Sequence, residues 1–170
     1  MAKALLITRD DIVKKTALNG NVDVDLFIQF VNIAQDTHLQ NYLGTDLLEK
    51  IQALIVAGTL DDVGNADYKA LLLDYVKSML IHWAMVEYLP FASYTIANKG
   101  MYKHGSENSE TVSKNEVDFL IEKQRNIAQH YTRRFIDYMS FNQSKFPEYY
   151  SNSNGDMYPS SESDFGGWVI

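Results

Sequence analysis

The residues from Ala66 to Leu89 place the strongest constraint on the fold, because this stretch has few charged side chains and is otherwise largely apolar or aromatic. At 100° per residue, its large side chains gather in one row of a helix that widens to about half the circumference. The stretch is therefore predicted to be a central, largely buried helix, which Pro90 ends or kinks. The row consists of Tyr68, Leu72, Leu73, Tyr75, Val76, Met79, Leu80, Trp83, Ala84 and Val86.

The last turns of this predicted helix are apolar on every side. The polar sector holds Asp67, Asp74, Lys77, Ser78 and His82, but further along it is occupied by Ile81 and Met85. A helix that is apolar all round has to be covered completely. The cover is expected to come either from the rest of the domain or from another chain, so Ile81 and Met85 are candidate residues for protein interaction.

Composition limits the classes of protein to consider. A chain of 170 residues with 46% hydrophobic and 12% aromatic residues is large enough for one domain with one core. The net charge of −7 and the scattered basic residues argue against a sequence-reading nucleic-acid binder. Cysteine is absent, which removes disulfides, thiolate zinc sites and thiol nucleophiles and fits assembly in a reducing cytoplasm. No apolar stretch approaches the ~20 residues of a membrane span, so no membrane association is expected.

Capping residues and glycines divide the chain into helices. Thr8 with Asp11, and Ser113 with Glu116, have the spacing of a capping box at a helix start. Gly44 and Gly58 follow apolar periodic segments at the usual position of a helix end. The sequence thus predicts an all-α fold, a single bundle of about five helices covering residues 9–17, 24–42, 46–57, 66–89 and 114–142. A further helical turn or two is expected over 91–98, and an exposed loop over 101–112.

The composition changes after residue 146, which predicts a helical domain over 1–146 and an extended C-terminal arm over 147–170. Residues 151–164 are rich in Ser, Asn, Asp, Gly and Pro, and no helix or strand is expected there. The chain nevertheless finishes in an apolar cluster, which favours a binding element. The candidate interaction residues of the arm are Tyr149, Tyr150, Tyr158, Phe165, Trp168, Val169 and Ile170.

Catalytic and metal-binding motifs are missing from the sequence. Its four histidines include no pair at i,i+3 or i,i+4, so no helix presents a paired metal site. There is no G-x-S-x-G, P-loop, G-x-G-x-x-G or H-E-x-x-H motif. We expect a protein that is not an enzyme and that holds no metal or cofactor, although a site assembled from distant residues stays open as a weaker alternative.

Three parts of the chain resemble a known family. They are the stretch QNYLGTDLL at 40–48, the stretch KSMLIHWAMVEYLPF at 77–91, and a set of junctions comprising Lys99-Gly100, SENSE at 106–110 and FPEY at 146–149. Over nearly the whole chain, the sequence resembles head-to-tail connector (adaptor, or ring) proteins of tailed bacteriophages, most closely those of crAss-like phages of Bacteroides. These motifs are features of helix junctions, and the resemblance carries over no catalytic residue.

The resemblance implies an all-helical virion subunit, assembled in the bacterial cytoplasm, that forms a closed, twelvefold ring under the portal vertex. The implied partners are the portal protein and adjacent tail or ring proteins, and DNA passes through the lumen without sequence-specific binding. An acidic lumen would let the duplex slide. The alternative is a small cytoplasmic helical adaptor or regulator that binds a protein partner through the same arm.

Overall fold

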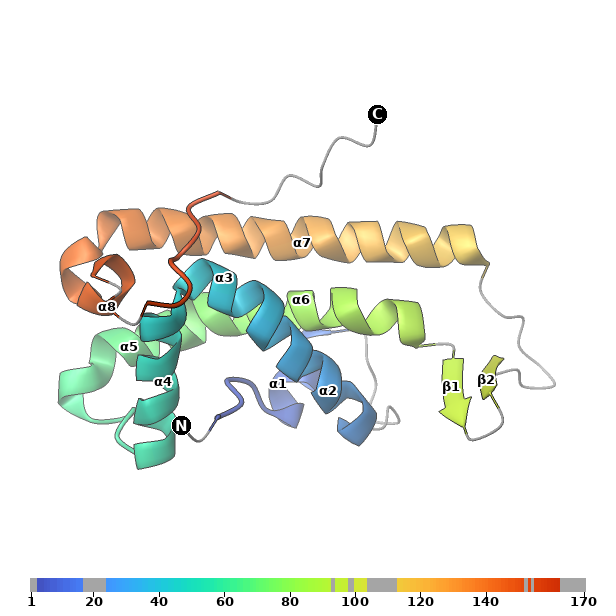
Figure 1. Cartoon of the computed structure of the whole chain (residues 1–170), viewed down its shortest axis with the longest axis horizontal. Helices are drawn as coiled ribbons and strands as arrows, with labels where there is room; N and C mark the ends of the chain where they lie inside the picture. The colour runs from blue at the N-terminus through green and yellow to red at the C-terminus, as the bar shows by residue number, and fades with distance from the viewer. Residues whose placement is uncertain are drawn as a thin grey trace.

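The computed structural model describes residues 3–16, 24–92, 94–97, 100–103, 113–151, 153 and 155–162. Within these residues, helical rods follow one another in the predicted order, so the fold is all-α (Figure 1). Three rods are single helices: α1 (Arg9–Lys15), α4 (Thr45–Ala57) and α7 (Lys114–Phe141). A fourth rod consists of α2 (Val24–Ala34), the π-helical turn η1 (Gln35–Leu39) and α3 (Gln40–Leu43). A fifth consists of α5 (Ala66–Leu71), the π-helical turn η3 (Leu72–Val76) and α6 (Lys77–Tyr88). Shorter pieces are the 3-10 turns η2 (Val63–Asn65), η4 (Leu89–Phe91) and η5 (Gln143–Lys145), and the single turn α8 (Pro147–Tyr150).

Capping determines where the helices begin and end. Both predicted capping boxes are present: Thr8 and Asp11 exchange hydrogen bonds at the start of α1, and Ser113 and Glu116 do so at the start of α7. Gly58 ends α4 in the left-handed conformation, with φ of 68°. These local signals explain why the helix ends lie within a residue or two of their predicted positions.

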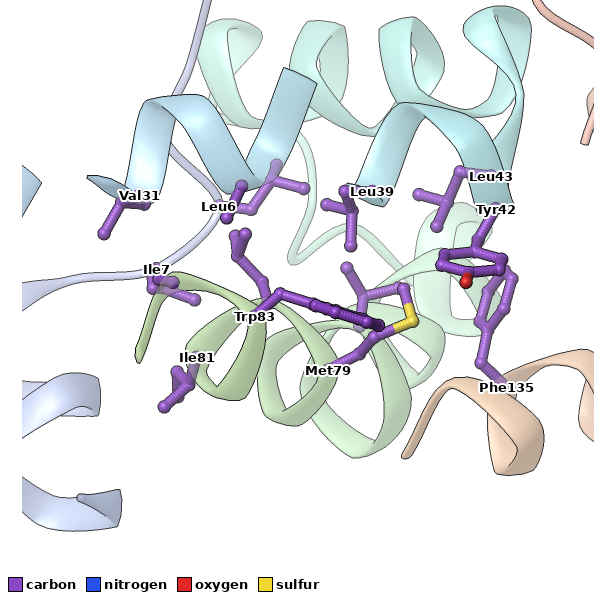
Figure 2. Close-up of a cluster of buried hydrophobic side chains, with 14 of the residues drawn as sticks. Leu6, Ile7, Val31, Leu39, Tyr42, Leu43, Met79, Ile81, Trp83 and Phe135 are labelled. Atoms are coloured by element: carbon purple, nitrogen blue, oxygen red, sulfur yellow. The ribbon is translucent and has the colours of Figure 1, made fainter. Parts of the chain in front are cut away.

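The core forms around α6, which packs mainly against α7 and α2 (Figure 1). Trp83 is 3% exposed, its ring stacks on His38 at 4.0 Å, and its Nε1 donates to Thr132 Oγ1 at 3.0 Å. Figure 2 shows Met79 and Trp83 of α6 pointing toward Leu39 and Leu43. The prediction of a central buried helix is therefore confirmed.

The two π-helical turns were not predicted. In η1 the fully buried Gln35 donates to the Ala4 carbonyl at 3.0 Å and accepts from the Leu6 amide at 3.2 Å, which fixes the extended start of the chain. In η3, Leu73 is 42% exposed although it had been predicted in the buried row. A π turn accommodates one extra residue, so the rotation along the helix departs from 100° per residue at that point.

The polar sector of the central helix is partly covered rather than left to water. Lys77 Nζ lies 2.8 Å from Asp11 Oδ2, and both side chains are largely removed from solvent. Burial alone would raise the pKa of Asp11, but hydrogen bonds from Lys77 and Thr8 outweigh that effect and hold the pKa below its usual value of 3.8. This ion pair joins α1 to α6.

We expect Asp11→Asn to lower the free energy of unfolding at neutral pH by about 1 kcal/mol. Because folding lowers the pKa of Asp11, its carboxylate stabilises the folded protein fully at pH values above 3.8, the pKa in the unfolded chain. This stabilisation is lost as the pH falls through the lower pKa of the folded state. Urea unfolding of both proteins across a pH series should show the difference shrinking below 3.8. Asp10→Asn, in the same first turn, is the matched control for the helix dipole. A difference that stays constant into strong acid would contradict this assignment.

The segment after Pro90 differs from the prediction of further helix. Only η4 continues the helical path, and the chain then forms β1 (Tyr94–Ala97), which pairs antiparallel with β2 (Gly100–Lys103). Gly100 is the first residue of β2 and pairs with Ala97, so the glycine that was expected to end a helix belongs to a strand. The predicted loop over 101–112 is likewise corrected at Met101–Lys103, and the remainder of it lies outside the described residues.

Candidate interaction surface

The apolar end of α6 is covered by the protein's own domain. Ile81 is completely buried and Met85 is 3% exposed. The neighbouring Tyr88 is held edge-on by Phe27 and Phe30 of α2, at ring distances of 5.1 and 5.5 Å. Ile81 and Met85 therefore do not form an interaction surface, and the alternative that another chain covers them is wrong.

The arm does not begin at residue 147, because α8 belongs to the helical body. Phe146 is completely buried against Tyr68, and Tyr149 is 7% exposed and packs edge-on against Phe135. Tyr150 is 44% exposed, but its hydroxyl donates to the Met139 carbonyl at 2.6 Å. The predicted boundary at 146 is thus corrected, and Tyr149 is a core residue. An aromatic run after a proline gave no indication of this, because it fits a buried turn and an exposed arm equally well.

Beyond α8 the chain folds back across the junction of α3 and α4 (Figure 1). We call Ser153 with residues 155–160 the C-terminal strap, and the residues Gln40, Asn41, Gly44, Thr45 and Asp46 the α3–α4 socket. In the single chain this part of the predicted arm is therefore docked on the helical body. Tyr158 of the strap is 69% exposed, while Phe165, Trp168, Val169 and Ile170 lie outside the described residues.

Thr45 is the centre of the contact between strap and socket. Its amide donates to the Met157 carbonyl at 3.0 Å, and its hydroxyl accepts from the Met157 amide at 3.1 Å. The same hydroxyl lies 3.0 Å from Asp156 Oδ2. At the two ends of the strap, the Ser153 amide donates to Asp46 Oδ2 at 2.7 Å and the Ser160 amide donates to the Asn41 carbonyl at 2.8 Å.

Gly44 explains why the strap is needed at this junction. It is the N-cap residue of α4 and has no side chain with which to cap the helix. Its φ of 74° favours glycine, and a Cβ at this position would lie 2.8 Å from Pro159 Cδ. The strap supplies the missing partner for the first amide of α4, and only glycine lets Pro159 approach so closely.

We expect Gly44→Ala to destabilise the protein more than Gly58→Ala. Both glycines have a left-handed φ, so each substitution carries a backbone strain of about 1–3 kcal/mol. A Cβ at Gly58 meets nothing within 4 Å, whereas one at Gly44 also displaces Pro159. Thermal unfolding of the two variants should therefore show the lower Tm for Gly44→Ala. Equal melting temperatures would show that the Pro159 contact adds nothing.

An exposed apolar pair on α7 was not predicted from the sequence. Phe119 is 66% exposed and Leu120 is 46% exposed, and no residue of α7 before Ala128 is buried. The helical period over 114–142 places Leu120 on one row with Val117, Ile121 and Tyr131, which predicts that it is buried, so its exposure is a correction. Phe119 stands two residues from Ile121, hence about 200° away around the helix, so a large apolar residue opposite the buried row was a signal available in the sequence. We call Phe119 and Leu120 the α7 apolar pair.

Two of the described histidines, His38 and His82, join helices. His38 Nε2 lies 2.8 Å from Glu87 Oε1, which connects η1 to α6. His82 Nδ1 lies 3.0 Å from Gln124 Oε1, and burial lowers the pKa of His82 despite this hydrogen bond. The described part of the chain contains no cluster of His, Cys, Asp and Glu that could hold a metal ion. His104 lies outside that part.

A polar hollow of about 350 Å³ lies beside the strap and the socket. Acidic and amide side chains line it together with one lysine, which pairs with Asp36 at its edge. Its lining residues are Lys3, Asp36, Gln40, Thr45, Leu48, Glu49, Gln52 and Asp156. Their mixture of charges and amides does not favour one ligand.

The fold defines an all-α protein with exposed apolar side chains on α7 and on the strap. A family model matches residues 39–158, and the chain belongs to that family, DUF6712, a family of unknown function. The match contains both the socket and the strap through Tyr158. No curated protein and no solved structure matches the chain. Among the described residues, no helix has the length and apolar character needed to cross a membrane.

Proposed function

We propose that the chain is a structural virion protein of a tailed bacteriophage, one subunit of a closed, twelvefold ring that connects the portal vertex to the tail. The resemblance of the helix junctions to head-to-tail connectors supports this proposal. The proposed partners are further copies of the chain, the portal protein and adjacent tail or ring proteins. The subunit is assembled in the bacterial cytoplasm and has no catalytic role.

The α7 apolar pair is the observation that carries the proposal furthest. A cyclic ring is built from heterologous contacts, so each subunit needs two different surfaces that fit one another. The pair lies on the first half of α7, near the hairpin end of the molecule in Figure 1, whereas Tyr158 lies on the strap at the α3–α4 junction. Two separated apolar surfaces are what a head-to-tail contact between subunits requires.

The charge of the chain supports a role as a DNA conduit rather than a DNA binder. At a net charge of −7 per subunit, a ring is strongly acidic and repels the phosphate backbone. The duplex then passes through the lumen without being held.

The adaptor alternative depended on a free arm beginning at residue 147. In the single chain α8 and the strap dock on the helical body, which weakens that alternative. Sedimentation equilibrium of the purified full chain tests the proposal. We expect one large species whose mass is a multiple of 19.4 kDa. A single species of 19.4 kDa at every concentration would contradict it.

A further inference from the structure

We infer that the α3–α4 socket is a peptide-binding site that holds, in the assembled ring, the C-terminal strap of a neighbouring copy of the chain. The inference rests on the proposed ring. It adds to that proposal the contact by which one subunit holds the next, and it names the occupant: residues 156–160 of the strap of the adjacent subunit.

The socket recognises the strap through hydrogen bonds at several separate points. Thr45 bonds both the amide and the carbonyl of Met157, and the Asn41 carbonyl accepts from the Ser160 amide. Asp156 receives hydrogen bonds from Thr45 Oγ1 and from Gln40 Nε2, at 3.0 and 3.3 Å. Such a site selects an extended peptide with an acidic side chain in one position. The same segment from a second copy would satisfy every one of these groups.

Little apolar surface ties the strap to its own body. Met157 is 39% exposed and Tyr158 is 69% exposed, so two of the largest side chains of the strap are not enclosed in the subunit. When the strap moves to another copy, neither of these side chains leaves a fully buried site, and a neighbouring subunit could cover Tyr158. Domain exchange of this kind costs little because the same contacts are made before and after it.

The connection from α8 to the strap is suited to a change of direction. Ser151, Ser153 and Gly155 are all exposed, and Gly155 has φ of 68° with nothing within 4 Å of a Cβ placed there. If residues 156–160 are the part that is exchanged, residues 151–155 connect them to α8, and five residues in extended conformation span about 17 Å, enough to reach an adjacent subunit while α8 stays packed. The family match extends through Tyr158 and so includes both halves of the contact.

The absence of cysteine allows a direct test. Asn41→Cys and Ser160→Cys in one full-length chain place two thiols at the far end of the contact, where the backbone atoms are 2.8 Å apart. Chains labelled with ¹⁵N are mixed with unlabelled chains before assembly, and the rings are treated with a short bismaleimide. Mass spectrometry of the joined peptides then shows whether the two thiols came from one chain or from two. The single-cysteine chains control for random collision.

We expect about half of the joined peptides from rings to be isotopically mixed, together with a ladder of linked subunits on a denaturing gel. Rings that yield only unmixed peptides would overturn the exchange and leave the proposed function standing. Where electron micrographs of the same sample show no rings, the proposed function fails. In that case mixed dimers would still support exchange, and unmixed peptides alone would contradict it.

Discussion

Replacing Trp83 with alanine is expected to lower the free energy of unfolding by about 3–5 kcal/mol, the usual cost of removing a large aromatic side chain from a core. Trp83 is 3% exposed and lies on α6, which contacts α7 and α2. Its indole stacks on His38 and donates to Thr132 Oγ1. The Thr132 hydroxyl still donates to the Ala128 carbonyl without the indole, so the loss comes chiefly from the cavity. Urea unfolding, monitored by circular dichroism, measures this change in the free energy of unfolding.

Trp83→Phe separates the contribution of the buried side-chain volume from that of the hydrogen bond to Thr132. It keeps most of the buried volume and removes the hydrogen bond, so we expect a loss of about 1–2 kcal/mol. If Trp83→Ala unfolds at the same urea concentration as the parent, α6 is not the centre of the core.

Introducing a charge at the α7 apolar pair is expected to abolish ring assembly without unfolding the subunit. Phe119→Asp places a carboxylate at a side chain that is 66% exposed in the single chain, so the subunit loses little buried surface. Within a subunit interface, the same carboxylate would be buried without a partner, which costs several kcal/mol for each contact around the ring. We expect the variant to sediment as a single chain with an unchanged circular dichroism spectrum and unchanged Tm.

Ser140→Asp provides a matched control, because it adds the same charge at an exposed position near the other end of α7. It should assemble as the parent does. Rings formed equally well by Phe119→Asp would remove the α7 apolar pair from the interface.

Local chemistry made most of the helices predictable. The Thr8–Asp11 and Ser113–Glu116 boxes and the glycine at position 58 act over three or four residues, so their effect can be read directly from the chain. The burial of Trp83 was also predictable, because Trp83 lies on an apolar row that follows the regular helical period of 100° per residue. The π turn at Leu72–Val76 was not, since one extra residue in a helix leaves no local mark in the pattern.

The interaction surface was less predictable, because it depends on which segments meet across long distances in the sequence. The apolar circumference at Ile81 and Met85 required a cover, but no local pattern tells whether that cover is the same chain or another. The strap is held by hydrogen bonds between residues more than one hundred positions apart, such as Thr45 with Asp156. Its polar composition indicated the absence of helix and strand but carried no information about where it docks.

Imaging of the purified full chain by negative-stain electron microscopy tests the central claim most directly, because it reports closure as well as size. The account predicts closed rings of uniform diameter with an open central channel, and class averages with one rotational symmetry. Single particles of the size of one chain, or open filaments without closure, at the highest soluble concentration would contradict it.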